Sequence, residues 1–573
     1  MRYQRPFLLS VLLLLFTLMP RCQTVWIDPL SQGDVVHGQG WQELRGSYVR
    51  LPDKAKGVVR DAVWNLSRNS SGLTLVFRSD ANCITVRYGV SESQYAFHMS
   101  PTSKSGVDLY ATDPNGKRLW CAPDFTPQFG DTITYNFSDL TYRERRKTHE
   151  YHLHLPSYNT IKFLEIGINQ GAQITFQKES LERPIVVYGT SIAQGALASR
   201  QGLSWTSTVE RELEHPLVNL AFSGNGRLES EVFRLLSEID AKLYIVDCMP
   251  NMSEQDPIED LILSGIGILR QGHDCPILLV EHSGYEGEAS SQSRETYRRI
   301  NEKLWKGYQR ILEAGYRNVF YMSHDEIAQG SDGQVEGIHP NDLGMRRHAD
   351  AYERRIKEIL HEDFHFFTPC KQSRDSYVWN DRHERVMEMA AKNKPRVLFI
   401  GDSITHFWGG EPDSGKANGP KAWDSLFKGV NILNLGFGWD RIENMLWRLS
   451  HGELEGYGAE EIFIMAGTNN LSENTDEQIA GGIQEMVQLI RQRQPKARIH
   501  VLGIYPRRDL EERITGLNAL LRASLAGTDV TFIDLSGVLS SKDGKIIDEY
   551  YLDGTHPSEK GYAKVAGVLK SFL

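Results

Sequence analysis

The sequence predicts a multidomain protein in which a β-sandwich is followed by two α/β modules, each built on a parallel sheet. Short strands with alternating apolar residues fill roughly the first third of the chain. Beyond them, short runs that are apolar on both faces alternate with helical stretches, which is typical of a parallel sheet covered on both sides. This α/β pattern starts a second time near residue 397, and 573 residues are too many for one hydrophobic core.

Residues 1–23 are expected to be a targeting segment. Arg2 and Arg5 precede an apolar stretch, residues 7–18, that is too short to cross a bilayer. We therefore expect a cleaved signal peptide, export to the periplasm or the extracellular space, and no stable membrane insertion afterwards. Lipid attachment at Cys22 is disfavoured, because the proline and arginine before it make a poor lipidation site.

Residues 24–182 are predicted to form the β-sandwich. Clusters of Gly, Asn, Asp, Ser and Pro separate short strands with period-two alternation, as in antiparallel sandwiches. The predicted strands are 73–77, 84–88, 133–137, 151–155 and 161–166. His152 and His154 alternate along one strand and are expected to face solvent. The sandwich either binds carbohydrate or only supports the module that follows.

Residues 183–362 are predicted to form the first α/β module, and residues 395–573 the second. The first contains predicted strands at 185–188, 243–246 and 277–280, with helices at 294–313 and 342–360. Residues 363–394 are expected to be a linker with a lead-in helix at 381–392. The second contains predicted strands at 397–400, 462–465, 499–502 and 530–533. Thr475 and Gln478 form a capping-box pattern before a helix in this module.

Composition and charge exclude several functions. A net charge of −10 without a long basic run argues against nucleic-acid binding. The six cysteines include no CxxC pattern, so neither a zinc site nor a disulfide framework is expected. A Cys83–Cys121 bridge and unpaired buried thiols are both open. No metal or organic cofactor is expected.

Two serines occupy the same kind of setting. Ser191 lies in PIVVYGTSIAQG and Ser403 lies in RVLFIGDSITHF. Each follows a short apolar run, and a glycine two residues earlier allows a tight turn from strand to helix. Such a turn exposes the hydroxyl at the carboxyl edge of the sheet, where ligands bind, and brings backbone N–H groups of the helix start near it. Each serine is therefore a candidate nucleophile.

Each candidate nucleophile is followed by a candidate base with a carboxylate three residues before it. The pairs are Glu336 with His339 and Asp553 with His556. A serine hydroxyl needs a base, and a carboxylate on the other ring nitrogen fixes the tautomer of the histidine. Asp332 is a rival partner for the first histidine.

Oxyanion donors can also be named in each module. A backbone N–H and a side-chain amide suffice for this role, and losing one donor typically costs about 3–4 kcal/mol of barrier. Gly224 and Asn251 fit in the first module. The backbone N–H of Trp439 and the side chain of Asn469 fit in the second. The site is thus repeated along one chain.

Four sequence blocks of the second module, GDSI, NLGFGWD, GTNN and DGTH, resemble the SGNH (GDSL-type) hydrolase superfamily. LWRL and GELE add a similarity to the catalytic subunit of platelet-activating factor acetylhydrolase. The first module, with GTSI, AFSGNG, DCMPNM and EGIHP, looks like a more divergent member. Residues 106–110 resemble the GxDLY β-domain that precedes such modules in secreted bacterial esterases. The resemblance implies flavodoxin-like modules and the ten site residues named above.

Three departures from the family pattern stand out. Trp439 replaces the oxyanion glycine, so an indole shapes or blocks the second pocket. Glu336 replaces the usual aspartate, and the third block of the first module is Met249-Pro250-Asn251 where the family has Gly-x-Asn. The two sites are therefore expected to differ in specificity.

The resemblance implies a secreted esterase that removes acetyl groups from sugars, with acetylated sialic acids and plant polysaccharides both open. One alternative is a short-chain acyl or lipid esterase of the acetylhydrolase type. Another is a carbohydrate-binding protein with one or both modules inactive. Two groups of residues remain pocket candidates: Glu281 and His282 after a strand, and His406, Phe407 and Trp408 after the second serine. The three that follow the second serine either line a sugar-binding rim or pack over the helix start.

Overall fold

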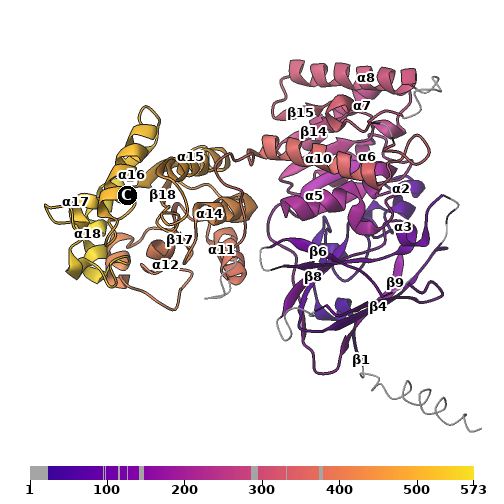
Figure 1. The fold of residues 1–573 in the computed structure, drawn as a ribbon. Coiled ribbons are helices and arrows are strands. Elements are labelled where there is room, and N and C mark those ends of the chain that lie inside the picture. Colours follow the sequence, from indigo (N-terminus) through magenta and orange to yellow (C-terminus); the bar gives the residue numbers. More distant parts are fainter. Residues whose placement is uncertain are drawn as a thin grey trace, which may run out of the picture.

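The computed structural model describes residues 24–573 except 95, 97, 114–115, 125–126, 141–147, 286–293, 331 and 373–378. An antiparallel β-sandwich is followed by two α/β modules, each with a parallel sheet between helices (Figure 1). This is the predicted fold class. The expected signal peptide and Cys22 lie outside the described residues.

Two antiparallel sheets make up the sandwich and enclose one apolar core. The first has the order β1-β9-β4-β7, and the second has the order β10-β3-β8-β5-β6 with β2 paired to β3. Their strands are β1 (Thr24–Ile27), β2 (Val36–His37), β3 (Thr74–Ser79), β4 (Cys83–Val90), β5 (Asp108–Thr112), β6 (Arg118–Cys121), β7 (Ile133–Ser138), β8 (His149–His154), β9 (Ile161–Asn169) and β10 (Ile174–Phe176). The α-helices of this region are α2 (Asp61–Leu66) and α3 (Pro101–Ser105).

The first α/β module has the strand order β12-β11-β13-β14-β15, all parallel, which is the flavodoxin-like order. The strands are β11 (Ile185–Gly189), β12 (Leu217–Ala221), β13 (Leu243–Asp247), β14 (Ile277–Val280) and β15 (Val319–Met322). The helices are α4 (Ser191–Gln194), α5 (Trp205–Leu213), α6 (Ser230–Leu236), α7 (Ile258–Leu269), α8 (Arg294–Glu313), α9 (His324–Ile327) and α10 (Asp342–Leu360). Apolar clusters on both faces of the sheet explain its two-sided apolar strands.

The second module repeats this topology, with the order β17-β16-β18-β19-β20. The strands are β16 (Val397–Gly401), β17 (Ile432–Gly436), β18 (Glu461–Met465), β19 (Arg498–Leu502) and β20 (Thr531–Ile533). The helices are α11 (Trp379–Asn393), α12 (Ser403–His406), α13 (Pro420–Leu426), α14 (Ile442–Arg448), α15 (Asp476–Arg493), α16 (Glu511–Ser524), α17 (Ser536–Leu539) and α18 (Glu559–Leu569). The capping box of Thr475 and Gln478 is present at the start of α15, as predicted.

One expectation for the sandwich is wrong. His152 and His154 are buried, not solvent-facing. Their sheet packs against the first α/β module, where His154 lies with Thr206 and Glu210 around a small gap. Alternating polar and apolar residues predict a strand with one face in solvent. In this protein the first α/β module covers that face, so both histidines are buried.

The GxDLY segment provides a polar contact of this same interface. Asp108 is buried and accepts a hydrogen bond from the backbone N–H of Gly202 at 3.0 Å. The same carboxylate pairs with Arg200 of the first module. The sandwich is therefore bonded to the module that follows it.

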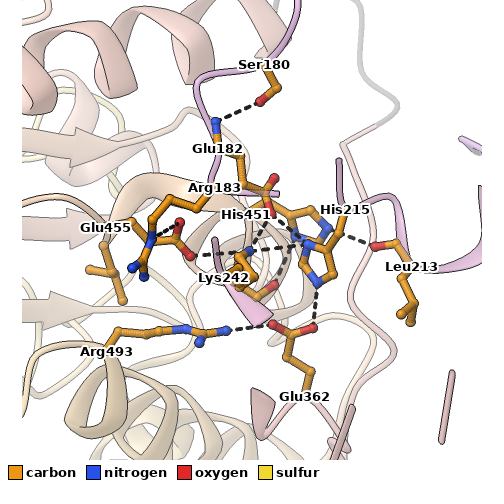
Figure 2. Close-up of polar contacts among 12 residues, drawn as sticks. Ser180, Glu182, Arg183, Leu213, His215, Lys242, Glu362, His451, Glu455 and Arg493 are labelled. Atoms are coloured by element: carbon orange, nitrogen blue, oxygen red, sulfur yellow. Dashed lines mark hydrogen bonds and ion pairs between the residues drawn. The ribbon is translucent and has the colours of Figure 1, made fainter. Parts of the chain in front are cut away.

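A buried ionic cluster joins the two α/β modules (Figure 2). The Nζ of Lys242 has no solvent exposure and donates to the carbonyl oxygen of Ser450 at 2.7 Å, and it pairs with Glu455 at 3.2 Å. Glu182, at the junction between the sandwich and the first module, also accepts from this Nζ. A lysine is tolerated in such a site only because carboxylates surround it. The cluster thus ties one module to the other.

His215 occupies the second half of the cluster. Its Nδ1 lies 2.6 Å from Glu182 and its Nε2 lies 2.8 Å from Glu362, while its ring stacks on His451 of the second module at 4.4 Å between centroids. Glu362 also pairs with Arg493 of the second module at 2.8 Å. Every charge in this half has an opposite partner, which offsets the cost of burial.

The five described cysteines are all free thiols, so Cys83 and Cys121 form no bridge. Of these, only Cys248 is fully buried, and the others are partly exposed. The expectation of unpaired thiols is correct, but that of general burial is wrong. Among the described residues, no helix combines the length and apolar character needed to cross a bilayer.

Candidate active sites

The first site forms where β11 turns into α4. Ser191 is the first residue of α4, and its Oγ lies 2.7 Å from Nε2 of His339. The Nδ1 of His339 is hydrogen-bonded to Oε1 of Glu336. Asp332, the rival, offers only its backbone carbonyl to Asn341 among the contacts described. Glu336 is therefore the carboxylate that orients this histidine.

The second site repeats the arrangement where β16 turns into α12. The Oγ of Ser403 lies 2.9 Å from Nε2 of His556, and Nδ1 of His556 lies 2.7 Å from Oδ2 of Asp553. Both serines are largely buried. Each site thus contains a continuous Ser–His–carboxylate chain of hydrogen bonds.

The histidine loops of the two modules have the same backbone design. An isolated antiparallel bridge closes each loop, from Gln334 to Pro340 in the first and from Tyr551 to Pro557 in the second. A helix begins directly afterwards, α10 in the first module and α18 in the second. The proline that follows each histidine in the sequence therefore marks the end of this closed loop.

Both carboxylates are held in the ionised form. Burial raises the pKa of each, but hydrogen bonds from the backbone and ring of the neighbouring histidine outweigh burial. The net result lowers the pKa of Glu336 and brings the pKa of Asp553 to about 2. At neutral pH each can stabilise an imidazolium formed beside it.

The predicted oxyanion residues lie on the loops after β12 and β17. Gly224 has φ 68° and Trp439 has φ 69°, so the two modules use the same left-handed backbone with different side chains. Glycine adopts this conformation freely, whereas for an L-residue it costs about 1–2 kcal/mol. The indole of Trp439 is 48% exposed, so it stands at the surface of the second site.

The two predicted amide donors differ in their hydrogen bonds. The amide oxygen of Asn251 accepts from the backbone N–H groups of Asn225 and Gly226, at 3.0 and 3.1 Å, in the orientation that satisfies both ends of the amide. Asn469 donates from Nδ2 to the carbonyl oxygen of Asp440 at 3.0 Å. Both arrangements leave an N–H of the amide for a further acceptor.

Two buried arginines, which were not predicted from the sequence, support the strands that pair with the serine-bearing strands. Arg50 of the sandwich donates to the carbonyl oxygens of Asn219 and Ala221, at 3.1 and 2.7 Å, on β12. Arg382 of α11 donates to the carbonyl oxygens of Asn434 and Gly436, at 3.3 and 2.8 Å, on β17. Strand pairing makes Asn219 and Asn434 equivalent, as it does Ala221 and Gly436. No local sequence signal marks either arginine, because its acceptors are distant in the chain.

Asp402, directly before the second serine, is a further residue of note. It is fully buried, its Oδ1 accepts from the backbone N–H of Ile404 at 2.9 Å, and burial raises its pKa to about 7. Thr190 takes its place in the first module. The second site therefore has a titratable group beside the nucleophile that the first lacks.

The other pocket candidates have different outcomes. Glu281 hydrogen-bonds to Tyr321 and His324 at the far side of the sheet, and His282 is buried beside it, so this pair anchors the end of β14. Trp408 is buried and stacks on Tyr562, which is core packing.

His406 and Phe407, the other two candidates that follow the second serine, have different surroundings. The Nδ1 of buried His406 accepts from the backbone N–H of Gly438 at 3.0 Å. Phe407 lies 6.0 Å from His556 between ring centroids and is the aromatic that does border the site.

A cavity of about 380 Å³ opens beside the second site and is lined by Trp439 and Asn469 among others. A larger cavity, about 520 Å³, lies where the sandwich meets both α/β modules, and its described lining includes neither serine. The smaller cavity is the one that reaches the oxyanion residues. Among the described residues, no group of three or more His, Cys, Asp or Glu side chains could hold a metal ion.

Two Ser–His–carboxylate chains at the carboxyl edges of flavodoxin-like sheets define an SGNH-type serine hydrolase. Comparison with family models agrees with this class. A GDSL-like lipase/acylhydrolase model matches residues 182–357, a second such model matches 399–564, and the GxDLY model, the N-terminus of SGNH-hydrolase-type esterases, matches 24–174. The chain belongs to the GDSL-like lipase/acylhydrolase family, an ester hydrolase family, and carries two of its modules behind a GxDLY domain.

Individual relatives resemble parts of the chain. The alpha1 subunit of human platelet-activating factor acetylhydrolase IB is 35% identical over 211 residues, which are 36% of this chain and 87% of the relative. The rat alpha2 subunit is 36% identical over 200 residues, 34% of this chain and 83% of the relative. The crystal structure of a GDSL-like lipase from Bacteroides ovatus is 29% identical, with a TM-score of 0.55, and covers 59% of this chain and 98% of its own.

Proposed function

We propose that this protein is an exported esterase that removes O-acetyl groups from sugars at two active sites. Ser191 and Ser403 are the nucleophiles, and His339 and His556 are the bases. Glu336 and Asp553 orient these histidines. The distances of 2.7 and 2.9 Å between serine Oγ and histidine Nε2 support both roles. The apolar segment at the N-terminus supports export.

The reaction would run through an acetyl-enzyme. Serine Oγ attacks the acetyl carbonyl carbon while Nε2 of the histidine accepts the hydroxyl proton. The oxyanion receives hydrogen bonds from the backbone N–H at position 224 or 439 and from the amide of Asn251 or Asn469. The imidazolium then protonates the sugar oxygen as the C–O bond breaks. Water, deprotonated by the same histidine, attacks the acyl-serine and releases acetate and the free serine.

The lining of the 380 Å³ cavity is the observation that carries the sugar assignment. It is dominated by charged and amide side chains: Lys371, Gln372, Arg441, Asn444, Asn469, Glu473 and Arg507. A long acyl chain needs an apolar channel, whereas hydroxyl-rich ligands need hydrogen-bonding groups. The cavity therefore favours a polar leaving group, and the acyl group is a short one.

A second candidate function is a short-chain acyl or lipid esterase. Its support is the sequence similarity to subunits of platelet-activating factor acetylhydrolase. The same serine chemistry would serve it. A binding protein with inactive modules is the third reading, and two intact Ser–His–carboxylate chains argue against it.

Acetate release separates these readings. The wild-type protein is assayed on acetylated xylan, pectin, O-acetylated sialic acids and an acetylated phospholipid, with the Ser191→Ala/Ser403→Ala variant as the blank. We expect acetate from at least one sugar, little from the phospholipid, and none above background from the variant. Release from the phospholipid alone would contradict the sugar assignment, and full activity of the double variant would contradict the mechanism.

A further inference from the structure

The cavity beside the second site carries an excess of positive charge. Its charged lining residues are Lys371, Arg441, Glu473 and Arg507. It also contains Asn469, the amide expected to hold the oxyanion, so a ligand in the cavity would lie next to the reacting ester. What fills the cavity therefore bears on which sugar is hydrolysed.

Two of the three cations already have partners of opposite charge. Arg441 pairs with Glu443 at 2.7 Å and also with Glu473. Lys371 lies 3.5 Å from Glu214 and over the ring of Trp447. Their positive charge is largely neutralised within the protein.

Arg507 differs from both. Within the part of the chain that the structure describes, no carboxylate lies within ion-pair distance of it, but its charge acts on buried Asp402 and opposes the rise in the pKa of that residue. Its Nη1 donates a long hydrogen bond of 3.4 Å to the carbonyl oxygen of Thr468. Thr468 directly precedes Asn469, so the guanidinium lies beside the oxyanion position. A half-buried guanidinium with donors to spare binds a carboxylate through paired hydrogen bonds.

Trp439, which also lines this cavity, combines a strained backbone with an exposed indole. It holds a left-handed backbone at φ 69°, where the first module keeps Gly224 at φ 68°. This backbone conformation is strained for tryptophan, and the indole that it positions is half-exposed and lines the same cavity. Strain of this kind gathers at functional positions, and a flat indole face is suited to the apolar face of a sugar ring.

The first module lacks the tryptophan, and its arginine near the oxyanion residue lies on a different loop: exposed Arg227 donates from Nε to the carbonyl oxygen of Gly224 at 3.1 Å. Arg507 follows β19, the fourth strand of its sheet, and the equivalent strand of the first module is β14. The sequence after β14, from 281 to 293, contains three glutamates and no lysine or arginine. An anionic substrate would be attracted to the second site by Arg507.

We propose that the second module selects an acetylated sugar that carries a carboxylate, with the sugar ring on Trp439 and the carboxylate on Arg507. The inference deepens the proposed function and rests on it. Sialic acids and galacturonate units share this chemistry, and the test distinguishes them.

The test uses Ser191→Ala protein, in which only the second site can act. Arg507→Gln is added, with Arg507→Lys as the charge-keeping variant. Arg522→Gln, an exposed arginine paired with Asp534 at 2.8 Å, is the matched control. Substrates are an O-acetylated sialic acid, an acetylated galacturonate oligomer and a neutral acetylated xylo-oligosaccharide.

We expect Arg507→Gln to raise KM about 10- to 100-fold for at least one of the acidic substrates while kcat changes little, because a charged hydrogen bond is lost from binding. KM for the neutral sugar stays within about twofold. Arg507→Lys recovers part of the loss, since it keeps the charge but not the fork, and Arg522→Gln has no effect. The acidic sugar whose KM rises identifies the source of the carboxylate.

Two failures are distinguishable. If acetate is released from sugars but Arg507→Gln leaves all KM values unchanged, or raises them for neutral and acidic sugars alike, the inference is wrong and the proposed function stands. If no sugar is deacetylated while an aryl acetate is hydrolysed, the proposed function fails and the inference fails with it.

Discussion

The two hydrolase modules place a serine, a histidine and a carboxylate at the same sheet edge but obtain their support from different parts of the chain. In the first, Arg50 of the β-sandwich binds the carbonyl groups at the end of β12. In the second, Arg382 of the lead-in helix α11 does the same for β17. Each arginine also lies over the equivalent phenylalanine, Phe222 or Phe437, at 5.3 and 5.2 Å from the ring centroid. The β-sandwich in one module and the helix α11 in the other thus each provide the arginine that binds these carbonyl groups.

The largest effect should follow from removing the orienting carboxylates. We expect Glu336→Gln in Ser403→Ala protein, and Asp553→Asn in Ser191→Ala protein, each to lower kcat on an aryl acetate about 10²- to 10⁴-fold, because the histidine loses its tautomer and its counter-charge. Asp332→Asn should leave the first site within about twofold. A large loss from Asp332→Asn with little from Glu336→Gln would show that the wrong carboxylate has been chosen.

The amide donors should come next. We expect Asn251→Ala and Asn469→Ala, in the same single-site backgrounds, to lower kcat about 10²- to 10³-fold with KM nearly unchanged, since an oxyanion donor acts mainly in the transition state. Steady-state kinetics on an aryl acetate measures this. If Asn251→Ala raised only KM, this amide would bind substrate and would not hold the oxyanion.

The comparison of supports predicts a stability effect. Arg50→Met removes the donor from four carbonyl groups, those of Leu66, Asn69, Asn219 and Ala221, so we expect the free energy of unfolding to fall by about 2–4 kcal/mol. Arg382→Met should have a similar effect on the second module. Arg45→Met, an exposed arginine paired with Asp34, should change stability by less than about 0.5 kcal/mol. Urea unfolding followed by fluorescence tests this, and equal effects of Arg50→Met and Arg45→Met would contradict the supporting role.

The smallest effect concerns Asp402. Burial raises its pKa from 3.8 to about 7, so the native state keeps a proton that the unfolded chain releases, and this stability contribution is lost as pH rises from 4 to 7. Asp402→Asn keeps the acceptor for Ile404 without the charge. We expect a gain of about 1–2 kcal/mol near pH 8 and none near pH 4. Thermal melts at pH 4 and pH 8 measure this gain. A gain that does not depend on pH, or the same gain from exposed Asp424→Asn, would contradict the role assigned to the buried Asp402 carboxyl.

The sequence predicted the fold class, most strands of both parallel sheets and, in each module, the serine, histidine and carboxylate that hydrogen bonds join. The roles of the four oxyanion residues stay predictions. The signals were local: a glycine before each serine, a carboxylate three residues before each histidine, and two-sided apolar strands. β12, β15 and β17 were not predicted, and the burial of His152 and His154 was misjudged. These depend on contacts between segments far apart in the chain. Arg50, Arg382 and Arg507 escaped notice for the same reason.

The central claim is that both serines act independently. Acetate release from an aryl acetate is measured for wild-type protein, Ser191→Ala, Ser403→Ala and the double variant. We expect each single variant to keep the activity of the other site, the two residual activities to add up to that of the wild type, and the double variant to lose at least about 10³-fold. A single variant that is as inactive as the double variant would contradict the account, because one module would then have no catalytic site of its own.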